Sequence, residues 1–317
     1  MNIVIFGAGA VGLGVGSCLA QADTHLTFVA RSATARELRE HGLRRSGIFG
    51  TRQIDPSQFD VIEQIDERAA SSIDYILVCT KSFDSPIAAK AIAASAACRN
   101  DSCKIVLFQN GWGNFEVFCR HFDPGRVFNA RVITGFERLA PNHVEVTVHA
   151  DAIKIGSLAD VDPGEMDDLA RRISEGGIPA EVTPTIQRDL WAKMLYNCCL
   201  NPLGAVLGVK YGRLGESEST RQIMDAIADE VFAVMRAAGF ETHWSDAAGF
   251  LRDFYAQMLP ATQAHSSSML QDLIAGRRTE IDAMSGAVVK LGSQHGLATP
   301  YNQAMRDLIR FKDQFAE

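Results

Sequence analysis

The sequence lacks the excess of basic residues that typifies proteins that bind nucleic acid. Its 317 residues include 31 lysines and arginines against 38 aspartates and glutamates, which gives a formal net charge of −7. Such a chain has no general attraction for nucleic acid or anionic membranes, although a local basic pocket is compatible with this balance. We expect a small-molecule substrate, with neither nucleic acid nor a membrane as partner.

Long apolar runs are also missing. No uninterrupted apolar stretch approaches the roughly 18 to 20 residues that are needed to cross a bilayer. The first 22 residues carry no charge, but five of them are glycines and none is the lysine or arginine of a secretion signal. We therefore expect a soluble, cytoplasmic protein.

Neither a disulfide framework nor a metal site is indicated. The seven cysteines are odd in number, irregularly spaced and without a CxxC pair, which favours a reduced, intracellular protein. The eight histidines are scattered, and no HxxxH or cysteine–histidine spacing predicts a metal ligand set. Cys198 and Cys199 are expected to fill a helix core, because no neighbouring base would activate either as a nucleophile.

What the chain does have is a large apolar fraction and alternating strand and helix patterns. Hydrophobic residues make up 47% of it, typical of a globular protein with a substantial core. Residues 2–6 and 25–30 resemble buried strands, and residues 10–20 and 33–41 resemble helices, so a βαβ unit and a parallel sheet are predicted. Further strands are expected at 75–79, 104–108, 127–134, 144–149, 152–155 and 180–182, with helices at 85–97 and 165–174.

The pattern changes near Pro184, after which no convincing alternating strand remains. Gly239 and Gly296 stand where helices are expected to end. We predict an α/β domain over residues 1–184 and an all-α domain over residues 185–317. The helices of the second domain are expected at 187–200, 220–238, 250–259, 268–280 running on to 295, and 301–315.

A glycine-rich turn follows the first strand directly and opens the first helix. It reads Gly7-Ala8-Gly9-Ala10-Val11-Gly12. The first glycine permits a tight turn, the second lets the backbone approach a pyrophosphate, and the third allows close helix–strand packing. The helix N-terminus adds unpaired N–H groups and a favourable dipole. We predict that these six residues bind a dinucleotide, making the first domain Rossmann-type; a glycine turn without a ligand is the alternative.

The end of the second strand has no acidic residue. An Asp or Glu there would bind the ribose 2′-hydroxyl of NAD, whereas an Arg accommodates the 2′-phosphate of NADP. The strand ends in Val29-Ala30-Arg31-Ser32, so Arg31 favours NADP(H) as cofactor. The alternative is that Arg31 is only a solvent-exposed residue at a helix start.

Three polar residues share one face of the helix predicted after Pro184. Lys193, Asn197 and Asn201 are spaced four apart, so successive side chains are offset by only about 40° around the helix axis. Apolar neighbours surround them, and buried amides are costly unless they find partners, which favours a functional face over a solvent-exposed one. Pro202 predicts a kink or an end just beyond.

A second polar cluster runs from His265 through three serines and on to Glu280. The serines are able to cap a helix, His265 is expected to cap or pack rather than bind a ligand, and Glu280 is either a surface acid or a functional one.

Taken together, the motifs resemble those of the ketopantoate reductase (2-dehydropantoate 2-reductase) family. The resemblance spans the glycine turn, Cys79-Thr80-Lys81, Gln109-Asn110-Gly111, WAKMLYNCCLN over 191–201, and SSML and GRRTEID over 267–270 and 276–282. It implies a Rossmann-type domain followed by a helical domain like that of 6-phosphogluconate dehydrogenase. It also implies NADPH-dependent reduction of ketopantoate to pantoate, a step towards pantothenate.

The resemblance assigns roles to particular residues. It makes Lys193 and Glu280 catalytic, with Lys193 as the proton donor, and it makes Asn197, Asn201 and Ser268 substrate-binding. Two further residues receive roles near the cofactor: Asn110, which contacts both cofactor and substrate, and Lys81, which contacts the cofactor.

Several alternatives stay open. A related 2-oxo acid or β-hydroxyacid dehydrogenase has the same architecture, and a protein that senses NADPH without turnover belongs to a different class. The presence of Lys193 together with Glu280 favours the enzyme, because a sensor needs no buried amine beside the nicotinamide. His265 and Trp112 depart from the family pattern and bear on the shape of the substrate. The sequence does not decide the oligomeric state, and a homodimer is compatible with it.

Overall fold

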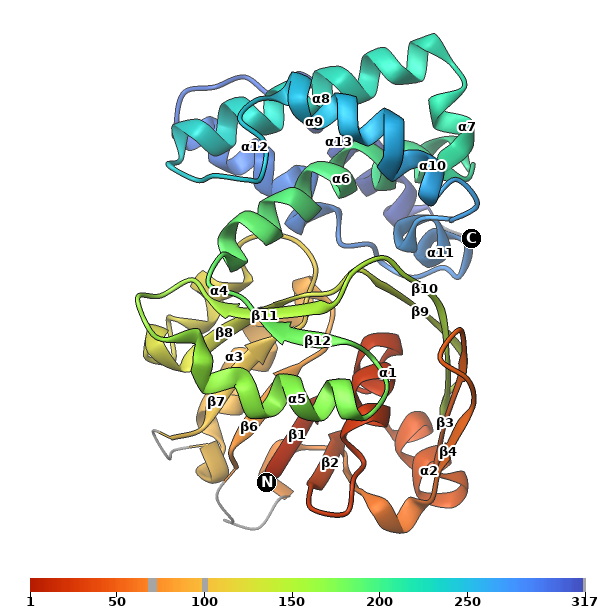
Figure 1. Ribbon diagram of the computed structural model, residues 1–317, viewed down its shortest axis with the longest axis vertical. Helices are drawn as coiled ribbons and strands as arrows, with labels where there is room; N and C mark the ends of the chain where they lie inside the picture. Colours follow the sequence, from red (N-terminus) through yellow and green to blue (C-terminus); the bar gives the residue numbers. More distant parts are fainter. Residues whose placement is uncertain (68–72, 99–101, 316–317) are drawn as a thin grey trace. The chain divides into compact units, whose positions relative to one another are not determined.

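The β-branched run Asn2–Phe6 forms strand β1 of the computed structural model, which describes residues 1–67, 73–98 and 102–315 (Figure 1). The chain divides into two compact units. The first comprises Met1–Gln109 and Asn114–Ile186, and the second comprises Asn110–Gly113 and Gln187–Glu317. The short segment Asn110–Gly113 therefore belongs to the second unit, although the chain on either side of it belongs to the first.

An eight-stranded sheet forms the centre of the first unit. Its strand order is β12-β11-β8-β7-β6-β1-β2-β5, and the six strands from β8 to β5 run parallel. Strand β11 is antiparallel to β8 and parallel to β12. The predicted parallel sheet is confirmed. The strands other than β1 are β2 (His25–Val29), β5 (Asp60–Ile62), β6 (Tyr75–Val78), β7 (Lys104–Leu107), β8 (Val127–Arg131), β11 (Ile153–Ser157) and β12 (Ala180–Val182).

Helices cover both faces of this sheet, which explains why its strands are apolar throughout. Along β1, Ile3 and Ile5 enter one core and Val4 enters the other. Helices α1 (Ala10–Leu19), α2 (Ser32–His41) and α5 (Asp167–Glu175) contribute to the first core. Helices α3 (Ser85–Ala94) and α4 (Asn114–Phe118) contribute to the second.

A second, four-stranded sheet was not predicted. It has the order β4-β3-β10-β9, built from β3 (Leu43–Gly47), β4 (Arg52–Ile54), β9 (Thr134–Ala140) and β10 (His143–His149). The sequence predicted one strand over 127–134, but the chain forms β8 and then begins β9. Strand β3 escaped notice because Leu43 is its only apolar inward residue, while the other inward residue, Arg45, is 4% exposed and donates to the carbonyl of Gly176. The sheet packs on α1, where the ring of Phe136 fills the space beside Gly14.

The second unit is helical, and no strand follows β12 in the part of the chain that the structure describes. Gly239 and Gly296 take φ values of +77° and +70° after α8 and α12, so both predicted helix ends are confirmed. No helix within the described ranges has the length and apolar character of a membrane span. The helices are α6 (Ile186–Leu207), α7 (Tyr211–Gly215), α8 (Glu218–Ala237), α9 (Ala247–Asp253), α10 (Leu259–Ala261), α11 (Ser268–Ile274), α12 (Ser285–Gln294) and α13 (Pro300–Gln314).

Two helix predictions were wrong. The helix expected from 268 to 280 and on to 295 ends at Ile274, because Gly276 takes a φ of +61° and the N–H of Arg277 bonds to the carbonyl of Asp272. A short 3-10 turn, Ile281–Ala283, then precedes α12. The helix expected over 187–200 does not end there but continues through Pro202 to Leu207. The first difference matters for the site, because it places Glu280 on a turn rather than inside a helix.

Candidate active site

The topology of the first unit brings the predicted cofactor-binding residues other than Asn110, which belongs to the second unit, to one edge of the sheet. Strand β1 lies between β2 and β6, and all three run parallel. The carboxyl ends of parallel strands meet at the same edge, which is where ligands bind in open α/β sheets. The turn over residues 7–12 follows β1, Arg31 follows β2, and Lys81 follows β6.

The structure requires glycine at two of the three glycine positions of the turn and leaves open space at the third. Gly7 takes a φ of +107°, and a Cβ there would lie 2.9 Å from the backbone nitrogen of Thr80. A Cβ on Gly12 would lie 2.1 Å from the carbonyl oxygen of Gly7. Gly9, in contrast, has no atom within 4 Å of the position of a Cβ. No side chain caps α1 and no acid stands in its first turn, so the open space at Gly9 fits a phosphate.

Arg31 is the N-cap residue of α2, and its side chain is 94% exposed. Its guanidinium lies 3.5 Å from the carboxylate of Asp84. Glu63, which sequence reasoning missed, follows β5 beside β2 and accepts a 2.6 Å hydrogen bond from the hydroxyl of Ser32. Arg39 lies 3.6 Å from Glu63 and offsets its charge. The signal that would have found Glu63 is the short strand β5, which pairs with β2.

Gln109 belongs to one of the motifs but received no role from the sequence, and it organises the loop that carries Lys81. Its amide nitrogen donates to the hydroxyl of Ser85 at 2.9 Å and to the carbonyl of Lys81 at 3.3 Å. The hydroxyl of Ser85 in turn donates to Asn114 at 2.8 Å. The end of β7 is thereby tied to the segment that follows β6.

The second unit joins an ammonium, an amide and a carboxylate. Lys193, half-buried on α6, donates a 2.7 Å hydrogen bond to Oδ1 of Asn110. Nδ2 of Asn110 donates at 3.3 Å to Oε2 of Glu280, which is 5% exposed. The direction is unambiguous, because an ammonium only donates and an ionised carboxylate only accepts. Lys193, Asn110 and Glu280, predicted from separate motifs, therefore form one chain of hydrogen bonds.

A close backbone approach brings Asn110 to this position. Gly111 has a φ of +86°, and a Cβ there would lie 2.3 Å from the carbonyl oxygen of Ala283, in the turn just after Glu280. The N–H of Trp112 donates to the same carbonyl at 2.8 Å. The Trp112 ring packs against Trp191 and Phe240, with ring centroids 4.9 Å and 4.8 Å away. Only glycine at 111 allows this contact.

The two asparagines of α6 are both buried, at 8% exposure for Asn197 and 3% for Asn201. Asn201 accepts a 2.5 Å hydrogen bond from the hydroxyl of Tyr211, a residue that sequence reasoning missed. Asn197 has no hydrogen-bond partner for its side chain in the described chain. A buried amide without a partner is costly, so Asn197 is suited to bind an incoming polar group.

The serine cluster divides into a structural and a candidate functional residue. Ser267 is fully buried, caps α11 by accepting from the N–H of Leu270 at 3.0 Å, and donates to the carbonyl of Asn201 at 3.3 Å. The predicted capping role of the serines is confirmed for this residue. Ser268 comes next, half-buried at the first position of α11.

The other singled-out residues have packing roles. The ring of His265 packs edge-on to Tyr211 at 5.3 Å, in agreement with the packing role expected for it. Cys198 and Cys199 are fully buried, and burial raises the pKa of the Cys198 thiol to about 12. Their predicted role in the core is confirmed. Among the described residues, no group of three His, Cys, Asp and Glu side chains is placed to hold a metal ion.

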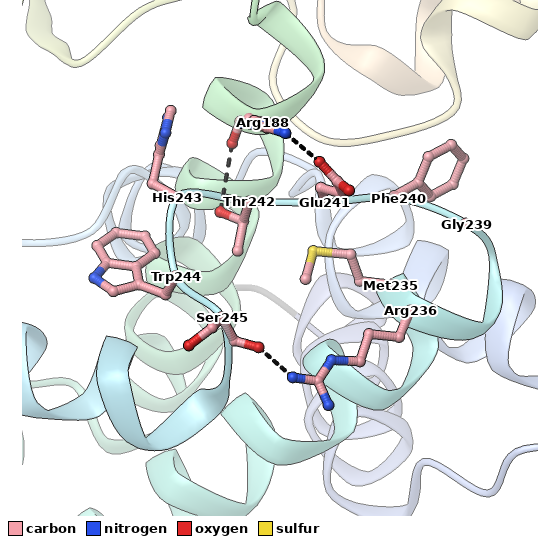
Figure 2. Close-up of a pocket in the computed structure, with 10 residues that line it drawn as sticks. All are labelled: Arg188, Met235, Arg236, Gly239, Phe240, Glu241, Thr242, His243, Trp244 and Ser245. Carbon is pink, nitrogen blue, oxygen red and sulfur yellow. Dashed lines mark hydrogen bonds and ion pairs between the residues drawn. The ribbon is translucent and has the colours of Figure 1, made fainter.

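A separate hollow of about 460 Å³ opens beside the start of α6 and is shown in Figure 2. Arg188 pairs there with Glu241, and the guanidinium of Arg236 donates to the carbonyl of Ser245. Nε2 of His243 lies 3.1 Å from the buried carboxylate of Asp189. Both guanidinium groups that line the hollow have partners, and none of the predicted site residues lines it.

Comparison with known proteins gives two family-model matches. The model described as "Ketopantoate reductase PanE/ApbA" matches residues 3–160, and "Ketopantoate reductase PanE/ApbA C terminal" matches residues 185–313. Among curated proteins, the 2-dehydropantoate 2-reductase of Aquifex aeolicus is 32% identical over 321 aligned residues. That alignment covers 99% of this chain and 98% of the relative.

Solved structures with the same architecture agree with these matches. A PanE/ApbA family ketopantoate reductase from Ralstonia eutropha JMP134 has a TM-score of 0.84 and 29% identity, with 99% of each chain covered. D-mandelate dehydrogenase, solved with NADH and anilino(oxo)acetate, has a TM-score of 0.87 over 99% of this chain and 98% of its own. At 23% identity, this second likeness concerns the fold alone.

Proposed function

Because the chain belongs to the ketopantoate reductase family, we propose that it is an oxidoreductase that uses NADPH to reduce a small 2-oxo acid, converting 2-dehydropantoate to pantoate. The observation that carries the proposal is the hydrogen-bonded chain of Lys193, Asn110 and Glu280 in the helical unit. An ammonium held by an amide, beside a face of further amides, suits the reduction of a ketone that bears a carboxylate.

A nicotinamide coenzyme, when bound, supplies the hydride, and the protein supplies the proton and the charge stabilisation. Negative charge develops on the carbonyl oxygen of the substrate as its carbon is reduced. The ammonium of Lys193 stabilises that charge and donates the proton that makes the alcohol. The neutral amide of Asn110 accepts from the ammonium at one end and donates to Glu280 at the other, so it orients Lys193.

The same face of α6 binds the rest of the substrate in this proposal. Asn197 and Asn201 follow Lys193 at four-residue intervals and are buried, so their amide N–H groups suit the carboxylate or hydroxyl oxygens of a desolvated acid. Ser268 adds a hydroxyl from α11. Glu280 completes the catalytic set by holding Asn110 and accepting from a substrate hydroxyl.

The open turn at Gly7, Gly9 and Gly12 fits the pyrophosphate of the coenzyme, and Lys81 follows the neighbouring strand. We assign the preference for NADPH to Arg31, because its exposed guanidinium stands at the end of β2. Arg31→Ala is expected to weaken NADPH binding while leaving NADH binding nearly unchanged, as measured by coenzyme fluorescence titration. Arg36→Ala, also on exposed α2 surface, is the matched control. Equal affinities of the wild type for both coenzymes would contradict this assignment.

The direct test of the function is oxidation of NADPH against a panel of 2-oxo and 3-oxo acids that includes 2-dehydropantoate. We expect 2-dehydropantoate to be reduced with the highest kcat/KM. Turnover of another 2-oxo acid, with none of 2-dehydropantoate, would keep the reaction class and exclude the named substrate. If no acid is turned over, the proposed function is wrong.

A further inference from the structure

A buried tyrosine is hydrogen-bonded to one of the predicted substrate-binding amides. Tyr211 opens α7, Asn201 lies in α6, and each side chain belongs to a residue that is 3% exposed. The phenolic oxygen of Tyr211 lies 2.5 Å from Oδ1 of Asn201. Neither the family resemblance nor the spacing of the motifs assigned Tyr211 a role.

The chemistry of the two groups fixes the direction of this bond. Burial, with a smaller effect of neighbouring Tyr196, holds the pKa of Tyr211 well above its ordinary value, so the phenol keeps its proton. A buried hydroxyl needs an acceptor, and the only acceptor of the Asn201 side chain is Oδ1. Nδ2 therefore points away from the phenol, towards the thioether sulfur of Met284 at 3.7 Å. A thioether is a weak acceptor, which leaves N–H capacity on Nδ2 for a stronger partner.

We propose that Tyr211 is a positioning residue, which holds Asn201 so that its amide N–H groups rather than its carbonyl oxygen face the substrate. This inference rests on the proposed function, because N–H donors beside the Lys193 ammonium suit the oxygen-rich carboxylate of a 2-oxo acid. A flipped Asn201 would present a carbonyl oxygen to that carboxylate and repel it.

The backbone around Tyr211 is fixed independently of its hydroxyl. Its N–H donates to the carbonyl of His265 at 3.1 Å, and the N–H of Gly212 donates to the carbonyl of Gln263 at 3.0 Å. Ser267, in the same segment as Gln263 and His265, donates a hydrogen bond to the backbone carbonyl of Asn201. Tyr211→Phe keeps the ring and all these contacts, so it removes only the bond that orients the amide.

The kinetic test compares Tyr211→Phe, Asn201→Ala and the double variant with 2-dehydropantoate as substrate. Tyr211→Phe is expected to raise KM about tenfold, the effect of weakening one hydrogen bond to a charged group, with kcat changed less than about twofold. Because Tyr211 acts through Asn201, the double variant should be no worse than Asn201→Ala alone. An unchanged KM in Tyr211→Phe, or additive losses in the double variant, would overturn the inference.

The matched control is Tyr196→Phe. Tyr196 is a partly buried tyrosine of the same unit, but its hydroxyl bonds to Thr262 at 2.5 Å rather than to a predicted site residue. It is expected to leave KM unchanged. A rise in KM equal to that of Tyr211→Phe would mean that loss of any buried hydroxyl loosens the unit, and the inference would fail.

A second measurement needs no substrate and so separates this inference from the proposed function. The side-chain amide resonances of Asn201, identified by their loss in Asn201→Asp, should shift in Tyr211→Phe, while those of Asn197 stay in place. Unmoved Asn201 resonances would overturn the inference even if the enzyme reduces 2-dehydropantoate. Shifted resonances in a protein that turns over no acid would keep the Tyr211–Asn201 contact and exclude only the function.

Discussion

Nζ of Lys193 lies 2.7 Å from Oδ1 of Asn110, although 83 residues separate the two in the chain. The other end of the same amide donates to Glu280, 170 residues further on than Asn110. The two ends of the Asn110 amide therefore link the ammonium to the carboxylate. The exact placement of Asn110 depends on Gly111, whose missing Cβ allows the approach to Ala283.

Asn110→Ala is expected to lower kcat roughly 10- to 100-fold, the cost of a misplaced catalytic group. The ammonium loses the amide oxygen as an acceptor and Glu280 loses the amide N–H as a donor, so both side chains are held less precisely. Steady-state kinetics with 2-dehydropantoate measures the effect, and the thermal midpoint of the variant shows that the fold is retained. A folded variant whose kcat lies within about twofold of the wild type would show that Asn110 does not orient Lys193.

Glu280→Gln separates the charge of this residue from its shape. The substitution keeps an acceptor for Nδ2 of Asn110 but removes the negative charge near the ammonium. We expect kcat to fall and KM to rise, because both the orientation of Asn110 and the contact with a substrate hydroxyl depend on a full carboxylate. Kinetic constants equal to those of the wild type would show that the negative charge of Glu280 is not needed for the reaction.

Two substitutions in the glycine turn separate an effect on stability from an effect on coenzyme binding. Gly12→Ala places a Cβ against the carbonyl of Gly7, so the thermal midpoint should fall sharply or the protein should not fold. Gly9→Ala meets no neighbouring atom, so its thermal midpoint should stay close to that of the wild type. Its methyl group occupies the space assigned to the pyrophosphate, and NADPH binding should weaken at least about tenfold. Normal NADPH affinity in Gly9→Ala would contradict the predicted binding turn.

The ion pair between Arg131 and Asp151 makes part of the stability dependent on pH. Burial alone raises the pKa of Asp151, but the hydrogen bond and charge of Arg131, at 2.6 Å, outweigh it and hold the pKa below its ordinary value. The stabilisation is therefore present above the ordinary aspartate pKa of about 4 and is lost as the pH falls through the lower, folded value.

Asp151→Asn should accordingly lower the thermal midpoint at pH 7 by roughly 2 to 4 °C, and by less as the pH approaches 3. Arg131 is 4% exposed, so loss of its partner leaves a buried charge uncompensated. Glu181→Gln, which breaks only a surface pair with Lys154, is the control and should have little effect at either pH. A deficit in Asp151→Asn that is the same at pH 7 and pH 3 would refute the electrostatic explanation.

Periodicity predicted the elements whose burial follows a simple rule. The strands of the parallel sheet are apolar because helices cover both faces, and the four-residue spacing of Lys193, Asn197 and Asn201 identifies one face of α6. The second sheet escaped because Arg45 is buried by pairing with a backbone carbonyl. A pattern of apolar residues does not reveal a strand in which an arginine is one of only two inward residues.

Contacts between distant segments could not be predicted from spacing. The N–H of Trp112 meets the carbonyl of Ala283 only because turns bring these two segments together. The bond from Tyr211 to Asn201, ten residues away, likewise depends on the turn between α6 and α7. The end of α11 at Ile274 was missed because a glycine such as Gly276 also occurs within helices. Only the structure shows that this glycine has a positive φ. Lys193 and Glu280 were nevertheless predicted as site residues, because the motifs that contain them resemble those of a known family, and the structure joins both to Asn110.

The central claim is that Lys193 donates the proton to the substrate, and the kcat of Lys193→Ala tests it most directly. We expect kcat to fall roughly 10²- to 10⁴-fold, the usual contribution of a general acid. NADPH affinity should change little, because the glycine turn belongs to the other unit, and the thermal midpoint should show that α6 remains folded. A folded Lys193→Ala protein that binds NADPH normally and keeps a kcat near that of the wild type would contradict the account.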